Sequence, residues 1–531
     1  MSEFGYQRSK VRKTGMRFLL SLAVAAAIGL TGCANIESTK TGAAGTANSE
    51  AAAAGKIPIT TSSEEARKEF LQGRDLNEKL LVQDSIAHFD KAISLDPNFA
   101  WAELSRSGVS PTGKEFFDHL KKAVSLADKA SNGERLLILS TEAGANGNTT
   151  KQKEYLDQLV AAYPNDERAN FAIAGYYFGQ QNFAGAIQHY KKATEIEPKF
   201  SSAFNLLGYA YRQNEDYPNA ESAFKKYIEL IPNDPNPYDS YAELLLKMGK
   251  FDDSITQYRK ALSIDQNFIN AHQGIGMALL YQGKADEAAA EIEKINGKAR
   301  NDGERRTALF ALTVVDVDGG KWDKALADVD KQYALGEKTN DVPGMTGDLG
   351  LRANILLEMG KYDEAKAQYE KGLKMTEDSN LSQEIKDNAR LFHHYNMARV
   401  ALGKKDLTAA KSEAEAFWKG TEAKKNPAQT RVAHQLLGLI ALEEKNYDKA
   451  VSELKQANQQ NPYDLYRLCQ AYQSAGDAGH AKEYCGKAAN FNSLPAINYA
   501  FVRMKAAKAR DGGAMSRTRG VGSIGFMALS L

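Results

Sequence analysis

Small and aromatic side chains recur at a fixed interval in the middle of the chain. The small residues stand 34 positions apart, at Ala186, Ala220, Ser254 and Ala288. Aromatic residues stand three before and four after the first three of them, at Phe183, Tyr217, Phe251, Tyr190, Phe224 and Tyr258. Spacings of three and four place these side chains on one face of a helix. Prolines repeat the same interval and mark where helices end, at Pro164, Pro198 and Pro232. The pattern predicts an all-α fold of repeated helix pairs.

One copy of the repeat, which begins at Ser201, shows the pattern most completely. Its key positions are Phe204, Leu207, Gly208, Tyr211, Tyr217, Ala220, Phe224 and Pro232. In these positions it resembles the tetratricopeptide repeat, a 34-residue unit of two helices. The bulky Tyr227 stands where that family has a small residue. The resemblance implies a right-handed superhelical solenoid, in which small residues let paired helices approach closely.

The same pattern recurs less regularly on both sides of this stretch. A later copy contains Gly360, Tyr362, Ala365 and Tyr369. Between Pro97 and Pro164 the pattern is blurred, but the length fits two more helix pairs, with helices over residues 116–130 and 134–145. Residues 296–304 and 374–388 are expected to form longer connections. We therefore expect about twelve repeats in a solenoid over residues 63–505.

The N-terminus has the features of an export signal. Basic residues at 8–17 precede an apolar run at 18–30, which is too short to span a bilayer. The run ends in Leu30-Thr31-Gly32-Cys33, which resembles the lipobox of bacterial lipoproteins, and Met16 is an alternative start. The resemblance implies a signal peptide over residues 1–32 and a lipid on Cys33. Ala34 in place of Asp resembles the outer-membrane case, which places the protein on the periplasmic face of the outer membrane.

Two further segments differ in composition from the repeats. Residues 33–62 are rich in Ala, Thr, Gly and Ser, and we expect them to form a flexible tether behind the lipidated Cys33. Residues 506–531 are rich in Gly, Arg and Ser, and we expect them to be disordered. This tail contains a Gly-x-Gly-x-x-Gly pattern at 520–525, but no strand or helix is expected around it, so it does not predict a cofactor site.

The charge and the reactive side chains argue against nucleic-acid binding and catalysis. Five of the 68 basic and one of the 67 acidic residues precede position 33, which leaves 63 against 66 and a net charge of −3. Such a body has no basic field for a nucleic acid. The eight histidines form no metal-binding motif, and no nucleophile elbow or phosphate loop occurs. We therefore predict no catalytic residue, metal or cofactor, and rank an enzyme last.

In tetratricopeptide proteins the first helix of each pair lines the concave groove. Carried over by position, the groove residues are Phe171, Phe178, Asn205, Tyr209, Arg212, Gln213, Asp239, Glu243, Lys247, Gln273 and Tyr281. Their amides and tyrosines suit an extended peptide. The clamp that co-chaperones of this family use for a C-terminal carboxylate is absent, because the relevant position holds Phe171, Asn205, Asp239 and Gln273. A purely solvated helix face is the competing interpretation.

These features predict a non-catalytic scaffold that holds other envelope proteins or peptides and is attached to the membrane by its lipid. The alternative is a carrier that captures peptides or glycans. We also expect the groove side chains to leave the stacking interfaces free. Replacement of Tyr209, Arg212 and Tyr281 should then remove binding with little loss of stability.

Two cysteines remain besides Cys33. Cys469 and Cys485 fall on the two helices of the last repeat. An exported protein meets an oxidising compartment, which favours a disulfide. Their repeat positions are about a turn out of register, however, and a disulfide requires a Cα separation of about 4.4–6.8 Å. The sequence therefore leaves two alternatives open: a disulfide between them, or two buried free thiols.

Overall fold

The computed structural model describes residues 55–79 and 81–512 of the 531-residue chain. Within those ranges every regular element is a helix. The elements are α2 (Glu64–Glu78), α3 (Val82–Leu95), α4 (Ala100–Gly108), α5 (Gly113–Leu126), the 3₁₀ turn η1 (Ala127–Lys129), α6 (Asn132–Ala145), α7 (Thr149–Ala162), α8 (Glu167–Gly179), α9 (Phe183–Ile196), α10 (Ser201–Gln213), α11 (Tyr217–Leu230), α12 (Asn236–Lys247), α13 (Phe251–Ile264), α14 (Ile269–Tyr281), α15 (Ala285–Glu293), α16 (Asp302–Asp318), α17 (Trp322–Thr339), α18 (Val342–Glu358), α19 (Tyr362–Glu377), α20 (Gln383–Gly403), α21 (Leu407–Lys424), α22 (Pro427–Glu443), α23 (Tyr447–Gln456), α24 (Pro462–Ala475), α25 (Ala478–Ala489), α26 (Ile497–Ala500) and α27 (Arg503–Arg510).

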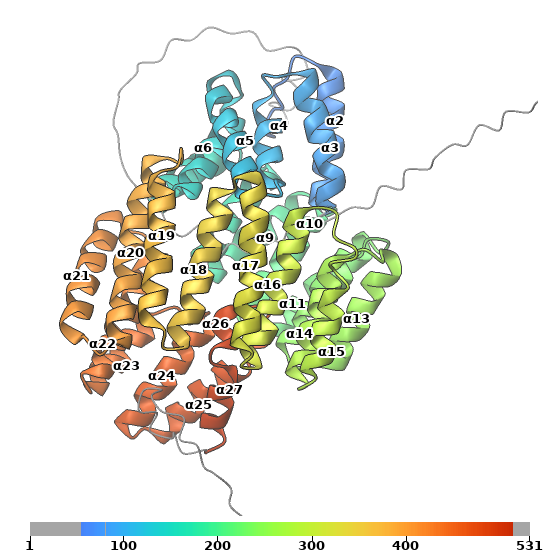
Figure 1. The fold of residues 1–531 in the computed structure, drawn as a ribbon. Coiled ribbons are helices and arrows are strands. Elements are labelled where there is room, and N and C mark those ends of the chain that lie inside the picture. The colour runs from blue at the N-terminus through green and yellow to red at the C-terminus, as the bar shows by residue number, and fades with distance from the viewer. Residues whose placement is uncertain (1–54, 80, 513–531) are drawn as a thin grey trace, which may run out of the picture.

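Consecutive helices pack as pairs, and each pair packs on the next. The pairs run from α2–α3 to α24–α25, which makes twelve pairs in the part of the chain that the structure describes. The short helices α26 and α27 follow the last pair and pack against it. Figure 1 shows the pairs winding from the blue N-terminal repeats to the red C-terminal ones. The solenoid of about twelve repeats is therefore confirmed, including the two pairs expected between Pro97 and Pro164.

A left-handed residue begins the tight turn within most pairs. In five successive pairs these residues lie 34 apart with φ between 60° and 82°, at Gly147, Gln181, Glu215, Gly249 and Gly283. In the first three of these turns the next residue caps the second helix, because its side chain accepts a backbone N–H; the caps are Asn148, Asn182 and Asp216. The 34-residue period therefore applies to the conformation of the turns as well as to the packing of the helices.

The small positions of the repeat allow paired helices to touch. A Cβ at Gly208 would lie 2.7 Å from the Phe224 ring, and Ala220 is fully buried. Such contacts are too close for a larger side chain. Tyr227, which replaces the usual small residue, is also fully buried, and its hydroxyl accepts a hydrogen bond from Asn236 at 2.7 Å. The departure from the repeat pattern is therefore accommodated by a polar partner in the next repeat.

The later repeats have longer helices than the regular ones. Helices α16 to α22 contain 16–21 residues, whereas α8 to α14 contain 12–14. The expected long connection at 374–388 is wrong, because α19 extends to Glu377 and α20 begins at Gln383. The connection expected at 296–304 is shifted, and lies between Glu293 and Asp302.

The superhelix is wound tightly enough for distant repeats to touch. The hydrogen bonds between residues more than 220 positions apart include Lys114 N to Asp341 Oδ1 (3.1 Å), Ser382 Oγ to Asn146 Oδ1 (3.1 Å), Asn426 Nδ2 to Gly147 O (3.1 Å) and Gln181 Nε2 to Asn458 Oδ1 (2.8 Å). These bonds link the turns of early pairs to the starts of late ones. The later repeats thus rest on the earlier ones, instead of continuing as an open coil.

Both ends of the solenoid extend beyond the predicted boundaries. Residues 56–62, assigned from the sequence to the tether, pack on the repeats, with Ile57 and Ile59 buried. At the other end α27 continues to Arg510, five residues past the predicted limit of 505. Cys33, the signal peptide expected over 1–32 and the tail beyond Gly512 lie outside the described residues. No described helix is both long and apolar enough to cross a bilayer.

Candidate functional site

The eleven predicted groove residues lie on the first helices of four successive pairs, α8, α10, α12 and α14. Asn205, Tyr209, Asp239 and Glu243 are buried. The other seven are half-buried: Phe171, Phe178, Arg212, Gln213, Lys247, Gln273 and Tyr281. The residues share the first helices of these pairs, but their side chains are more buried than the repeat pattern indicates.

The polar centre of the row is packed, not free. Arg212 pairs with Glu243 at 3.2 Å, and its guanidinium lies 4.6 Å from the centre of the Tyr209 ring. Tyr209 packs edge-on against the buried Phe224 at 5.2 Å. Burial raises the pKa of Glu243, and the charge of Arg212 opposes that rise. The expectation that Tyr209 and Arg212 leave the stacking interfaces free is therefore wrong.

The aromatic residues of the row also contribute to packing, both within the α8–α9 pair and against the start of the next repeat. The ring of Phe171 lies 5.5 Å from Tyr190 and 5.1 Å from Phe200, while Phe178 lies 5.6 Å from Phe183. Edge-on contacts of this kind add stability beyond their buried area. The aromatic side chains among the predicted groove residues therefore stabilise the fold.

A segment without regular structure from the C-terminal end lies across the groove. Residues 490–496, which we call the C-terminal strap, connect α25 to α26 without regular structure. Lys247 Nζ donates to the carbonyl of Phe491 at 2.9 Å, and Tyr281 Oη donates to the carbonyl of Ser493 at 2.5 Å. Lys247 and Tyr281 occupy equivalent positions 34 residues apart. Successive repeats therefore hold successive parts of one extended chain.

The strap is fixed at its far end by buried side chains. Tyr499 packs on Tyr281 at 5.5 Å, and Phe501 is buried in the same core as α14 and α16. Arg503 forms a two-contact ion pair with Asp318 of α16, at 2.7 and 2.5 Å. Sequence periodicity could not identify these residues, because they lie outside any repeat. The only available signal was the apolar cluster around Tyr499 and Phe501.

A cavity of about 420 Å³ lies between the groove and the strap. Four predicted groove residues line it, namely Arg212, Gln213, Glu243 and Lys247, together with the start of α24 and residues 491–498. Burial, and after it the positive charge of Arg212, lower the pKa of Lys247 to about 8. A second cavity, also of about 420 Å³, borders the other side of the strap and includes Lys247, Tyr281, Tyr499, Arg503 and Arg510.

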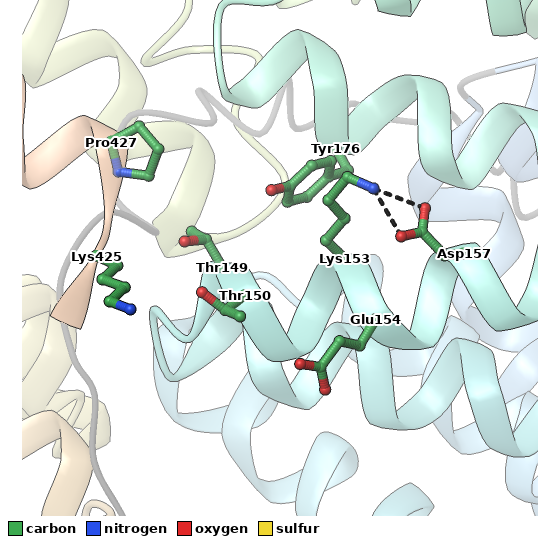
Figure 2. A pocket seen from close by; sticks show the side chains of 8 residues that line it. All are labelled: Thr149, Thr150, Lys153, Glu154, Asp157, Tyr176, Lys425 and Pro427. Atoms are coloured by element: carbon green, nitrogen blue, oxygen red, sulfur yellow. Dashed lines mark hydrogen bonds and ion pairs between the residues drawn. The ribbon is translucent and has the colours of Figure 1, made fainter.

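A smaller pocket of about 220 Å³ lies where early and late repeats meet, between α7, α8 and the start of α22. Figure 2 shows Thr149, Thr150, Tyr176, Lys425 and Pro427 around it. Lys153 points to Asp157, and its Nζ lies 2.9 Å from Oδ1 and 2.6 Å from Oδ2, so that its charge is neutralised inside the pocket (Figure 2). No described side chain that lines this pocket has a buried polar atom without a hydrogen-bond partner.

Seven of the eight histidines pair with another side chain through Nδ1, whereas the buried Nδ1 of His393 has no hydrogen-bond partner in the part of the chain that the structure describes. Several bind a carboxylate through Nδ1, as in His88–Glu69 (2.6 Å), His272–Glu291 (2.6 Å) and His434–Glu453 (2.8 Å). Each of these three pairs joins the two helices of one repeat, 19 positions apart. Among the described residues no three His, Cys, Asp or Glu side chains gather in a way that could hold a metal ion.

Cys469 of α24 and Cys485 of α25 form a disulfide in the structure, with a Cα separation of 5.1 Å. Both side chains are fully buried. The separation lies within the range that a disulfide requires, so the register argument against it does not hold. The bridge joins the two helices that precede the C-terminal strap.

The fold and the groove define the class of the protein, a helical-repeat solenoid with a covered concave face. Family models for the tetratricopeptide repeat match it at residues 201–234, 349–379 and 432–464, and a related TPR repeat model matches at 176–215 and 242–283. The chain therefore contains tetratricopeptide repeats, as the resemblance predicted.

Individual relatives match parts of the chain. Protein bimA of Emericella nidulans is 30% identical over 81 residues, which are 15% of this chain and 10% of that protein. A tetratricopeptide repeat protein from Parabacteroides merdae is 18% identical over 48% of this chain and 99% of its own, with a TM-score of 0.34. MamA from Desulfovibrio magneticus RS-1 is 16% identical over 32% of this chain and 97% of its own, with a TM-score of 0.28.

Proposed function

We propose that the protein is a non-catalytic scaffold that holds other proteins of the bacterial envelope. The observation that carries this proposal is the groove row, which carries polar and aromatic side chains on four successive first helices and binds a segment of the chain through Lys247 and Tyr281. Repeats of this kind create long concave surfaces suited to protein partners. The two contacts to the strap show how such a surface holds an extended backbone.

The proposed position of the scaffold is the periplasmic face of the outer membrane, with a lipid on Cys33. The lipobox-like run that ends at Cys33 and the basic residues before it support this position. A disulfide between Cys469 and Cys485 is compatible with an oxidising compartment. A stable attachment needs more than one acyl chain, which lipoproteins carry.

The anchor is tested by Cys33→Ser. The variant should incorporate no labelled fatty acid and should leave the membrane fraction, because the thiol is the acceptor for the lipid. Labelling or membrane attachment that persists in Cys33→Ser would contradict the anchor.

The groove is tested by photo-crosslinking in living cells. A benzoylphenylalanine at Phe178 replaces a similar ring, and a second at Gln273 samples the next part of the row. Both positions should yield crosslinks to envelope proteins. The matched control is Gln188 on the outer helix α9, which is exposed. Crosslinks to the same proteins from Gln188 but not from Phe178 or Gln273 would show that the convex face is the working surface.

A further inference from the structure

The cavity between the groove and the C-terminal strap has the size of a small-molecule site. Its volume of about 420 Å³ falls within the range of about 300–1,000 Å³ that such sites occupy. It is formed by parts of the chain that are far apart in sequence: α10, α12, the start of α24 and residues 491–498. It therefore exists only when the solenoid is closed.

Carboxamide side chains dominate the polar lining of this cavity. Six of them border it: Gln213, Asn458, Gln460, Asn461, Asn492 and Asn498. A carboxamide presents donors and an acceptor side by side, and each hydroxyl of a sugar is likewise both donor and acceptor. Leu246, Pro462 and Leu494 add apolar contacts for the C–H groups of such a ring. This lining suits a polyhydroxylated ligand better than an apolar one.

The charges around the cavity leave one cation without a counter-charge. Arg212 and Glu243 pair with each other at 3.2 Å. Lys247 forms no ion pair within the described part of the chain, and its hydrogen bond goes to the neutral carbonyl of Phe491. Burial together with the nearby Arg212 disfavours its charged form and lowers its pKa to about 8. An anionic group in the cavity would relieve this cost.

We propose that the cavity binds an acidic saccharide, with the sugar hydroxyls on the carboxamides and a carboxylate at Lys247. An extended peptide is less suitable, because the strap already occupies the path that such a chain would follow along Lys247 and Tyr281. The inference does not depend on the capture of a protein partner or on the lipid anchor. It rests on the cavity alone.

The test is calorimetric titration of the full chain, purified in detergent, at pH 7. The ligands are two acidic disaccharides, digalacturonate and the hyaluronan disaccharide, and two neutral ones, cellobiose and chitobiose. At least one acidic sugar should bind about tenfold more tightly than both neutral sugars. Lys247→Met should remove this preference, since it deletes the cation and keeps most of the stem.

A second variant tests the carboxamides without touching the strap contacts. Gln460→Ala combined with Asn498→Ala should weaken the bound sugar about tenfold, whereas the exposed Gln188→Ala on α9 should leave it unchanged. Thermal melts check that each variant is folded. No binding of any of the four sugars up to about 10 mM would overturn the inference, and so would unchanged binding in the Gln460/Asn498 variant. Equal affinity for acidic and neutral sugars would overturn the role of Lys247.

Discussion

Two extended segments dock on this solenoid, one at each end, and they are held in opposite ways. The N-terminal segment, residues 56–62, is bound through its backbone N–H groups. Ile57, Thr60 and Ser62 donate to carboxylates of Asp166, Glu134 and Asp96, each at 2.9 Å. The C-terminal strap is bound through its carbonyls, by an ammonium and a phenol.

The difference shows that the repeats have two kinds of binding site for segments without helical structure. Carboxylates near helix starts face the turns between repeats, and they bind donors strongly because the bonds are charge-assisted. Burial opposes ionisation of Asp96, but hydrogen bonds from Thr61, Ser62 and Asn98 lower its pKa below the ordinary value. Cations and tyrosines at the ends of the first helices face the groove and bind acceptors. A partner chain on the part of the groove that the strap leaves free is therefore expected to present its carbonyls.

The largest effect is expected from loss of the ion pair that fixes the strap. Arg503→Ala leaves the carboxylate of Asp318, only 5% exposed, without its partner. Such a loss costs about 3–5 kcal/mol of unfolding free energy. Urea denaturation should show it, and hydrogen exchange should rise in residues 490–506 but not in 56–62. The control is Lys487→Ala, which removes an exposed pair with Glu483 and should cost about 0–1 kcal/mol. Equal exchange in both segments would show that the two are not independent.

The second-largest effect is expected from loss of the disulfide. It joins the two helices that precede the strap, whereas the N-terminal segment at 56–62 contains no cysteine. Cys469→Ala with Cys485→Ala should lower the unfolding free energy by about 3 kcal/mol, the value for a loop of this length. Thiol alkylation of the unfolded, unreduced protein should leave both cysteines unmodified. Two modified cysteines would mean that the bridge is absent.

A smaller effect is expected at the N-terminal segment. Asp166 caps α8 by accepting from Arg168 and Ala169, both at 2.8 Å, and also accepts from Ile57. Asp166→Ala should cost about 2 kcal/mol, because a cap and a buried charge-assisted bond are both lost. The matched control is Asp216→Ala, which removes a cap and an exposed hydrogen bond from the Asn219 side chain but no bond to a docked segment, and should cost about 1 kcal/mol. If the two variants lose equal stability in urea, the bond to Ile57 adds nothing.

The smallest effect is a pH dependence at the strap. The pKa of Lys247 is about 8 in the folded chain against 10.5 for an ordinary lysine. Between these values the folded state binds fewer protons than the unfolded state, so the unfolding free energy rises with pH. Lys247→Met should remove about 1 kcal/mol of that rise, after allowance for its partial exposure. Urea denaturation at pH 7.5 and pH 10 measures it, with the exposed Lys250→Met as control. An identical rise in both variants would contradict the shift.

The regular repeats could be predicted from sequence because their contacts are local and periodic. Gly208, Ala220 and Phe224 lie within one 34-residue unit, so their spacing reports directly on their packing. The docked segments could not be predicted, since Ile57 meets Asp166 across 109 residues and Lys247 meets Phe491 across 244. The residues of the docked segments themselves follow no period, although Lys247 and Tyr281, which bind the strap, do. The same limit explains why the groove residues were identified but their burial was not.

The bonds between distant repeats change how the molecule would respond to mechanical load. A solenoid whose repeats contact only their neighbours can be stretched like a spring, because its coils are free to separate. Here the coils are joined by hydrogen bonds such as Ser382–Asn146 and Gln181–Asn458. Tension must first break these cross-links before any coil can open. We therefore expect the folded solenoid to resist extension more than one whose repeats contact only their neighbours.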